Sequence, residues 1–313
     1  MSKITYEFKT CNTPDGFSID SIETNLCKCT WVEIQNGNGE AAMGKSVGNY
    51  ITIETSILEN GQRGNLDEIA KTVSEYLVKI MNISDDDSVL VVGVGNRSVL
   101  ADSLGVRTVD KICVTRHVID ETNGELGTNL RPVSAIAPGV MGVTGLNTAE
   151  IIKSITDEVN PSLVIVIDAL AARKSHRICT TIQISDTGLT PSSGIVGKNK
   201  KQTINAEYLG RPVISIGIPT VINAANIVTD VLGLLLPQHD SFTSQGADGN
   251  TSFGGELIEN IRHYTDELFS ESSPFVTPKE IDATIHYSAY IISTAINIAL
   301  FGNEWMQLTH NSY

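Results

Sequence analysis

Two short apolar runs rich in β-branched residues constrain the fold of this chain more than any other feature. One run covers residues 88–95 and the other covers residues 161–168. Runs of this kind are typical of strands buried on both faces of a mainly parallel sheet. Asp102 follows the first run closely, and Asp168 ends the second. Because ligands of open α/β sheets bind beyond the carboxyl ends of the strands, the sequence predicts two acidic groups at the functional edge of an α/β fold.

The rest of the chain fits one domain built on that sheet. Residues 1–30 have little periodicity and are expected to form an N-terminal arm. Alternating residues at 30–34 and 50–54 predict a small β element before the main sheet. We find no internal repeat and no second core, so residues 31–313 are predicted to be a single α/β domain. Residues 237–274 are rich in Ser, Gly, Asp and Asn, which favours a partly mobile insertion.

Periodicity also predicts the elements that flank the two runs. Helices are expected at 66–80, 149–159, 221–236 and 278–301, where apolar residues recur at helical spacing or Pro and a capping residue mark a start. Further strands are expected at 111–115, 178–184 and 212–216, the second of them half-exposed and antiparallel. The Gly- and Pro-punctuated segment 131–145 is expected to be a loop near the site.

Charge and cysteine content exclude several classes of partner and site. The formal net charge of −14 disfavours nucleic acid and anionic membrane as partners. The sequence contains no apolar run of about 18 residues and no secretory signal, so we expect no membrane span. Its five cysteines lack a disulfide-like spacing. Cys27 and Cys29 have no matching pair elsewhere, so zinc is not expected and a reduced cytoplasmic protein is the simplest interpretation.

Each aspartate has an ordinary structural explanation when it is taken alone. Asp102 would compensate the dipole of a short helix, and Asp168 would cap a turn with Arg173 as its ion partner. Together they suggest chemistry, because two carboxylates brought close have pKa values that move apart. One then stays ionised as a base while the other is an acid, and such a pair can activate water against a peptide carbonyl.

Other catalytic motifs are absent or incomplete. The pair Gly93-Val-Gly95 lacks the third glycine of a dinucleotide fingerprint, so no nicotinamide cofactor is expected. None of the six histidines forms an H-E-x-x-H motif; His117 follows a predicted strand, where it is either a structural residue or a metal ligand. The serines form no G-x-S-x-G elbow, so a serine nucleophile is unsupported.

Several longer motifs resemble the spore germination protease family, a group of atypical aspartic endopeptidases of spore-forming bacteria. They are Gly93-Val-Gly-Asn96 with Asp102, Thr115-Arg-His117, the run 131–142, Ile167-Asp-Ala-Leu-Ala-Ala-Arg173, the run 181–188, Gly217-Ile-Pro-Thr220 and Val276-Thr-Pro-Lys-Glu280. The resemblance extends from Trp31 to Phe301.

The resemblance implies an endopeptidase that degrades small acid-soluble, DNA-protecting spore proteins during germination. It implies a fold similar to the hydrogenase-maturation proteases, a homotetramer, no cofactor, and action in the cytoplasm of the spore core. The two aspartates that the family considers catalytic match Asp102 and Asp168. We expect the segments 131–145 and 185–201 to line the substrate groove, with Arg131, Met141, Ser185, Asp186 and Gly194 as the candidate residues.

The N-terminus departs from the family pattern. Members carry an Arg-Thr-Asp-Leu-Ala-like stretch where the zymogen is processed, and this chain lacks it. Glu7 and Phe8 stand at a similar place and match the family preference for cutting after an acidic residue and before an apolar one. Self-processing between Glu7 and Phe8, with the arm as a pro-segment, is therefore our hypothesis.

Two other functions stay open on the sequence. One is a nickel-dependent protease of the maturation type, with Asp102, Asp168 and a histidine around the metal. The other is a non-catalytic paralogue that binds spore proteins without cutting them, which the altered N-terminus suggests.

Overall fold

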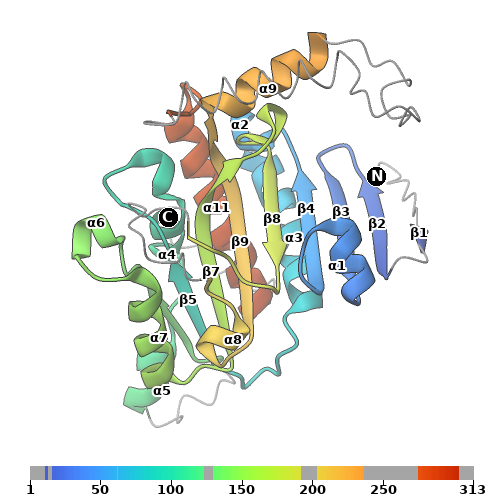
Figure 1. Cartoon of the computed structure of the whole chain (residues 1–313). Coiled ribbons are helices and arrows are strands. Elements are labelled where there is room, and N and C mark those ends of the chain that lie inside the picture. Colours follow the sequence, from blue (N-terminus) through green and yellow to red (C-terminus); the bar gives the residue numbers. More distant parts are fainter. Residues whose placement is uncertain are drawn as a thin grey trace.

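The structure is a computed structural model that describes residues 11–12, 16–61, 63–122, 130–191, 203–235 and 274–302. Within these residues one ten-stranded sheet crosses the molecule, with helices on both faces (Figure 1). The α/β class predicted from the sequence is confirmed. The strands are β1 (Cys11–Asn12), β2 (Phe17–Glu23), β3 (Lys28–Ile34), β4 (Gly48–Glu54), β5 (Val89–Gly93), β6 (Val133–Ile136), β7 (Leu163–Ala172), β8 (Thr181–Ser185), β9 (Val213–Asn223) and β10 (Phe275–Val276).

The pairing changes once across the sheet, from antiparallel between β1 and β9 to parallel between β9 and β6. The order is β1-β2-β3-β4-β8-β9-β7-β5-β6, and β10 pairs with β9 beyond this path. The four strands β6, β5, β7 and β9 are parallel to one another, whereas β8 is antiparallel to both β9 and β4. The parallel part is therefore confined to the half of the sheet that carries the two apolar runs. The small β element expected at 30–34 and 50–54 belongs to the same sheet, where it forms β3 and β4.

The helices divide between the two faces of the sheet (Figure 1). Their bounds are α1 (Gly37–Met43), α2 (Ile57–Asn60), α3 (Arg63–Ile80), α4 (Leu104–Val109), α5 (Arg116–Thr122), α6 (Met141–Thr144), α7 (Thr148–Val159), α8 (Ala206–Leu209), α9 (Ala224–Leu235) and α11 (Ile281–Phe301), with 3₁₀ turns η1 (Leu100–Asp102) and η2 (Ser175–Arg177). The larger core cluster joins α3, α4 and α11 to one face. A smaller cluster joins α7 and α8 to the opposite face of the parallel strands.

Part of the predicted N-terminal arm is a strand of the sheet, and several other predicted features lie outside the described residues. Residues 17–23 form β2, which pairs with β3 over its whole length, so this part of the predicted arm belongs to the sheet. Glu7 and Phe8 lie outside the described residues, as do Gly194 and most of the insertion predicted at 237–274.

The predicted strand at 111–115 is wrong, and its place at the sheet edge is taken by β6. Thr115 Oγ1 donates to the carbonyl of Arg131 and accepts from the main-chain N of Val133, so this segment is fastened beside β6. Its Cys113 N donates to the side chain of Asn297 in α11. Residues 133–136, expected to be loop, form the strand because they pair with β5.

The last described helix, α11, is buried within the fold as its apolar composition predicts. It is long and apolar enough to cross a membrane by length and composition alone, but 72% of its most apolar window is buried against the rest of the protein. The expected cap at Thr277 is wrong, because the Thr277 hydroxyl donates to the carbonyl of Thr220 and α11 begins only at Ile281. The helix therefore serves as the central core element behind the sheet.

Close backbone contact at Gly105 brings the segment after β5 against the parallel strands. A Cβ placed on Gly105 would lie 2.4 Å from the carbonyl oxygens of both Ile167 and Val94. Gly93 faces it, where a Cβ would lie 2.2 Å from the Gly105 oxygen. Only glycine leaves room for this approach, which holds η1 and α4 at the carboxyl end of β5.

We expect Gly105→Ala to lower the free energy of unfolding by more than about 3 kcal/mol, because backbone on both sides cannot give way. Urea denaturation followed by circular dichroism measures this change. Gly64→Ala in α3 is the control, since a Cβ there meets nothing within 4 Å. That variant should gain ~0.5–1 kcal/mol from helix propensity. Equal stability of the Gly105 variant and the wild type would contradict the steric argument.

Candidate active site

Asp102 lies in the 3₁₀ turn η1, which follows β5 and a tight backbone turn at Gly95 and Asn96. The main-chain N of Asn96 donates to the Asp102 carboxylate at 2.9 Å and to its carbonyl at 3.0 Å. Gly95 has a φ of +126°, and a Cβ there would lie 2.0 Å from the Asp102 carbonyl oxygen. A glycine at this position therefore allows the turn that folds Asp102 back over the end of the strand.

The carboxyl group of Asp102 is poised between its two protonation states. Partial burial raises the pKa of Asp102 to about 6, and the hydrogen bond from Asn96 opposes that rise. Because this value is close to neutrality, both the acid and the carboxylate are populated under ordinary conditions. A carboxyl group with such a pKa suits proton transfer.

Asp168 lies within β7 and not past its end, because β7 continues to Ala172 by pairing with β9. It is the first residue beyond the β5 pairing, which stops at Ile167. Its side chain has 0% exposure, and one carboxylate oxygen accepts a hydrogen bond from the Ala169 N at 2.9 Å. Both predicted aspartates thus lie at the carboxyl edge of the parallel strands, one half-buried and one fully buried.

A hollow lies beside Asp102, at the carboxyl edge of the parallel strands. It is lined mainly by apolar side chains: Val99, Ala101, Asp102, Ala169, Ala171, Thr220, Val221 and Phe275. Ala169 is the residue that follows Asp168. The hydroxyl of Thr220 donates to the Ala101 carbonyl at 2.7 Å and fastens η1 to β9. We refer to this space as the apolar hollow.

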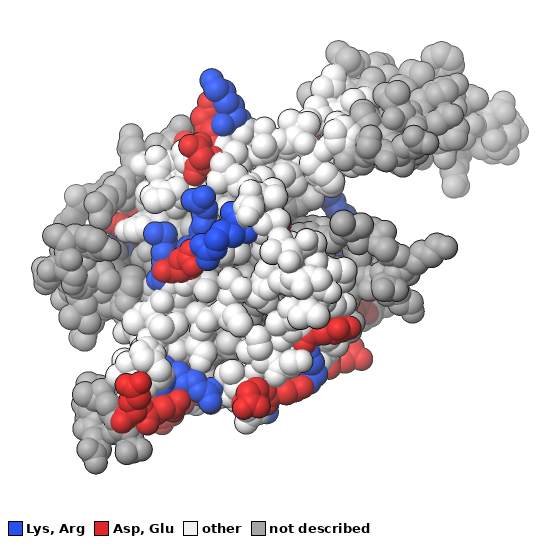
Figure 2. All heavy atoms as spheres, turned by 90° about the vertical axis from the view of Figure 1, so that its left-hand side faces the viewer, with Lys and Arg blue, Asp and Glu red and all other residues white. Residues whose placement is uncertain are grey.

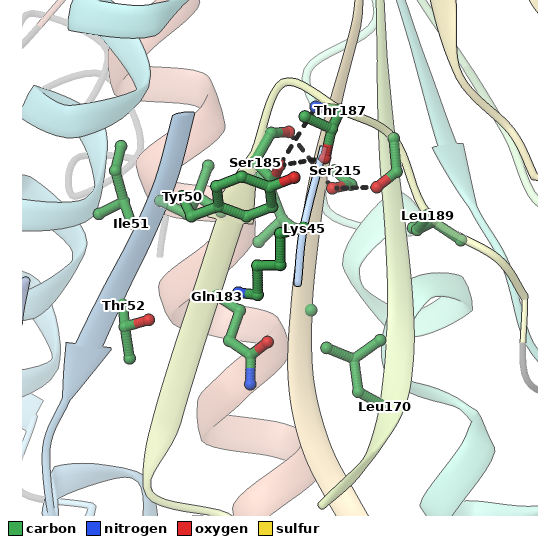
Figure 3. A pocket seen from close by; sticks show the side chains of 14 residues that line it. Lys45, Tyr50, Ile51, Thr52, Leu170, Gln183, Ser185, Thr187, Leu189 and Ser215 are labelled. Atoms are coloured by element: carbon green, nitrogen blue, oxygen red, sulfur yellow. Dashed lines mark hydrogen bonds between the residues drawn. The ribbon is translucent and has the colours of Figure 1, made fainter. Parts of the chain in front are cut away.

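A second hollow, which we call the basic hollow, lies over β4, β8 and β9 (Figure 3). Leu170 of β7 lines it, whereas Ala169 and Ala171 line the apolar hollow. Because successive side chains of a strand point to opposite faces, β7 separates the two spaces. Asp168 pairs with Gly217, and Gly217 pairs with Gln183 in the floor of the basic hollow.

Lys45 gives the basic hollow its charge. Its side chain runs between Tyr50 and Gln183, and its ammonium group lies 4.4 Å from the centre of the Tyr50 ring (Figure 3). Lys45 is exposed as a residue, but partial desolvation of its ammonium group lowers its pKa, and the nearby charges of Arg177 and Arg173 lower that pKa further. Within the described part of the chain no carboxylate forms an ion pair with Lys45. The hollow is therefore suited to an anionic group.

The candidate groove residues are placed in different parts of the molecule. Ser185 lines the basic hollow, where its hydroxyl hydrogen-bonds Thr187 and its carbonyl accepts from Ser215 (Figure 3). The adjacent Asp186 is turned toward β4, and both of its oxygens accept hydrogen bonds from Asn49.

Arg131 is not a groove residue in this structure. It precedes β6, at the amino edge of the parallel strands and so opposite the aspartates. It is 7% exposed, and its guanidinium group donates to the carbonyls of Ser84, Asp87 and Leu300. These bonds join the turn at Ser84 and Asp87 to the end of α11, which gives Arg131 a structural role.

Met141 begins α6, beyond the carboxyl end of β6, and is 41% exposed. Val143 and Leu146 beside it are also exposed. The face of the molecule that carries α6 shows charged side chains in a few groups containing both signs, with a wide uncharged surface between them (Figure 2). Such a surface can contact an extended polypeptide without strong charge selection.

The residues that sequence reasoning missed are Lys45 and Phe275. Lys45 lies in a turn after α1, and Phe275 lies in a two-residue strand that pairs with the end of β9. Neither stands in a motif, so only the pairing of distant strands reveals their place. Among the described residues no group of three His, Cys, Asp or Glu side chains comes together as a metal site.

Comparison with known proteins identifies the family to which the chain belongs. A sequence profile of germination proteases matches residues 3–271. Relatives described as germination proteases include one from Clostridium perfringens (strain ATCC 13124), 39% identical over 311 residues, with 96% of this chain and 93% of the relative covered. One from Caldanaerobacter subterraneus subsp. tengcongensis is 42% identical over 292 residues, with 91% and 88% covered. Another from Priestia megaterium is 42% identical over 321 residues, with 91% and 86% covered.

The fold and this similarity define a protease of spore germination, which is a hydrolase. The chain belongs to the germination protease family. Among solved structures, a NiFe hydrogenase maturation protease, HycI from Thermococcus kodakarensis KOD1, aligns with 16% identity and a TM-score of 0.29, covering 63% of this chain and 97% of that one. That score is too low to relate the two folds.

The pKa of Asp102 has a measurable consequence for stability. Its folded value of about 6 lies above the usual aspartate value of 3.8, so the cost of burying the charge is fully present above about pH 6 and disappears as the pH falls toward 3.8. We expect Asp102→Asn to raise the free energy of unfolding by ~1 kcal/mol near pH 8, after allowance for solvent screening, and to have little effect near pH 4. Urea denaturation at both pH values measures it.

Asp110→Asn is the matched control, because Arg97 holds the pKa of Asp110 below its usual range. That substitution should destabilise the protein near pH 8, opposite in sign to Asp102→Asn. A larger loss of stability for Asp102→Asn near pH 8 than near pH 4 would contradict the assigned cause.

Proposed function

We propose that this protease is an endopeptidase that starts the degradation of small acid-soluble spore proteins, with Asp102 and Asp168 acting on a water molecule. The observation that carries the mechanism is the half-buried Asp102 carboxyl, whose pKa is about 6, at the same carboxyl edge of the parallel strands as Asp168. No observation among the described residues favours the nickel-dependent alternative, since no third ligand joins the two aspartates.

In this mechanism the ionised carboxylate takes a proton from water as the oxygen attacks the scissile carbonyl. The protonated carboxyl group of the other aspartate gives a proton to the departing amine. Asp168 has no exposed surface. Its participation therefore requires a local opening at this edge. We propose that the full-length chain is a zymogen and that cleavage between Glu7 and Phe8 converts it into the active form. The active form is proposed to be a homotetramer that acts in the cytoplasm of the spore core.

We expect Asp102→Asn and Asp168→Asn each to lower kcat/KM by about 10²–10⁴-fold, the usual contribution of a positioned acid or base. Digestion of a purified small acid-soluble spore protein, with cut sites read by mass spectrometry, measures this loss with and without a chelator. The full chain and a chain that begins at Phe8 are compared. Asp110→Asn is the control at an exposed ion pair away from the hollow.

Full activity in either catalytic variant would contradict the two-aspartate mechanism. Loss of activity with the chelator would favour the nickel-dependent alternative. Binding of the spore protein without any cutting, by both the full chain and the chain beginning at Phe8, would favour a non-catalytic paralogue.

We place the acidic residue before the scissile bond in the basic hollow and the apolar residue after it in the apolar hollow. The side chains of an extended peptide alternate in direction, and the two hollows lie on opposite sides of β7. Lys45 supplies an ammonium group for the acidic side chain, supported by the charges of Arg173 and Arg177. Val99 and Phe275, which are 50% and 59% exposed, supply apolar contact area.

We expect Lys45→Met to reduce the preference for a Glu over a Gln peptide by ~10-fold, because a hydrogen bond to a charged group contributes about 1.5–3 kcal/mol. Values of kcat/KM for a matched pair of peptides measure the preference. Lys71→Met is the control, since Lys71 lies on the surface of α3 and pairs with Glu68. An unchanged Glu-to-Gln ratio in the Lys45 variant would remove this residue from the substrate site.

A further inference from the structure

The two cysteines that lie one residue apart in the sequence form a thiol pair in the fold. Cys27 occupies the turn between β2 and β3, and Cys29 lies in β3. Their sulfur atoms are 3.7 Å apart, at hydrogen-bonding distance. Both side chains are buried, with 6% and 3% exposure. No part of the proposed peptidase mechanism uses them.

The two residues differ in how firmly the backbone holds them. Cys29 pairs with Ile22 on one side and with Ile53 on the other, so two neighbouring strands fix it. Cys27 precedes the paired part of β3, and its carbonyl and N–H are both bonded to Thr24 within the same turn. Movement of this turn can bring Cys27 toward Cys29 without disturbing the ladder.

The surroundings also give the two sulfurs different chemistry. The hydrogen bonds from Cys29 and Thr24 lower the pKa of Cys27 to about 7, against the effect of burial. The same contact and burial raise the pKa of Cys29 well above its usual range. One sulfur is therefore a thiolate near neutrality while its neighbour stays a thiol, an arrangement that suits attack by Cys27 on a disulfide.

We propose that Cys27 and Cys29 are a reversible dithiol–disulfide site that exchanges with low-molecular-weight disulfides. In the first step the Cys27 thiolate attacks one sulfur of the small disulfide, and a small thiolate leaves. In the second step Cys29 loses its proton to solvent and attacks Cys27 Sγ in the mixed disulfide, which expels the second small thiolate. The protein loses two electrons and two protons, and the small disulfide is reduced to two thiols.

The geometry requires a limited movement. The sulfur atoms must approach from 3.7 Å to the bonded distance of about 2.05 Å. Because Cys27 is in the turn, it is the partner that moves. Exchange also requires the turn to open, since neither sulfur is freely exposed.

Oxidation of Cys27 and Cys29 also affects α3, because Tyr76 of that helix packs beside the two cysteines. Tyr76 and Cys29 belong to the same core cluster, and the Tyr76 ring makes an edge contact with Trp31 at 6.1 Å between centroids. A disulfide removes the Cys29 S–H and so changes the environment of both rings. Trp31 fluorescence is therefore a second readout, independent of peptidase activity.

The test incubates the full chain with oxidised glutathione, alkylates the remaining thiols with iodoacetamide and maps them by peptide mass spectrometry. We expect one peptide holding both residues to lose two hydrogens and escape alkylation, with full reversal by reduced dithiothreitol. The rate of formation should fall by ~10-fold for each pH unit below 7, because the thiolate fraction of Cys27 falls by that factor.

Cys113→Ser is the control and should oxidise like the wild type, whereas Cys27→Ser and Cys29→Ser should form no intrachain disulfide. Alkylation of both residues after complete incubation of the wild type would overturn the proposal. A disulfide from Cys27 or Cys29 to any other cysteine would do the same. These readings on the wild type do not depend on how well the variants fold.

Discussion

The approach of Gly105 to the carbonyls of Ile167 and Val94 is the contact on which the functional edge depends. It lets α4 rest directly on the ends of β5 and β7, so η1 is held at that edge. The Asn96 hydrogen bonds and the Thr220 hydroxyl then fix η1 from two further sides. Asp102 thus owes its position to backbone contacts, and its pKa to the burial that they produce.

The second determinant of the site is the unequal length of the strands. β5 stops at Gly93, but β7 and β9 continue as a pair, with β10 added at their far end. This extension buries Asp168 inside the sheet and separates an apolar space from a basic one. The reversal of direction at β8 adds Gln183 to the row that begins at Asp168, although the two residues come from strands of opposite sense.

The α/β class and the common edge of the two aspartates could be predicted from the sequence, because short β-branched runs report burial directly. The helix expected at 149–159 is α7 (Thr148–Val159), and in the structure the side chain of Asn147 caps it. Prediction from the sequence failed where contacts between residues far apart in the chain decide the local structure. Residues 133–136 read as loop until β5 pairs with them, and Thr115 is held by Arg131 and not by a strand. Lys45 and Arg131 carry no local pattern, so their roles follow only from the assembled fold.

The guanidinium group of Arg131 lies at the amino edge of the parallel strands, opposite to the edge that carries the two aspartates. There it joins the turn before β5 to the end of α11, two segments more than two hundred positions apart in the chain. The contacts of Arg131 therefore stabilise the edge of the parallel strands opposite to the edge that carries the two aspartates. The helix end and the turn are held together without the participation of any residue near the aspartates. Related proteases could consequently change their substrate preference without changing the contacts that join the turn before β5 to the end of α11.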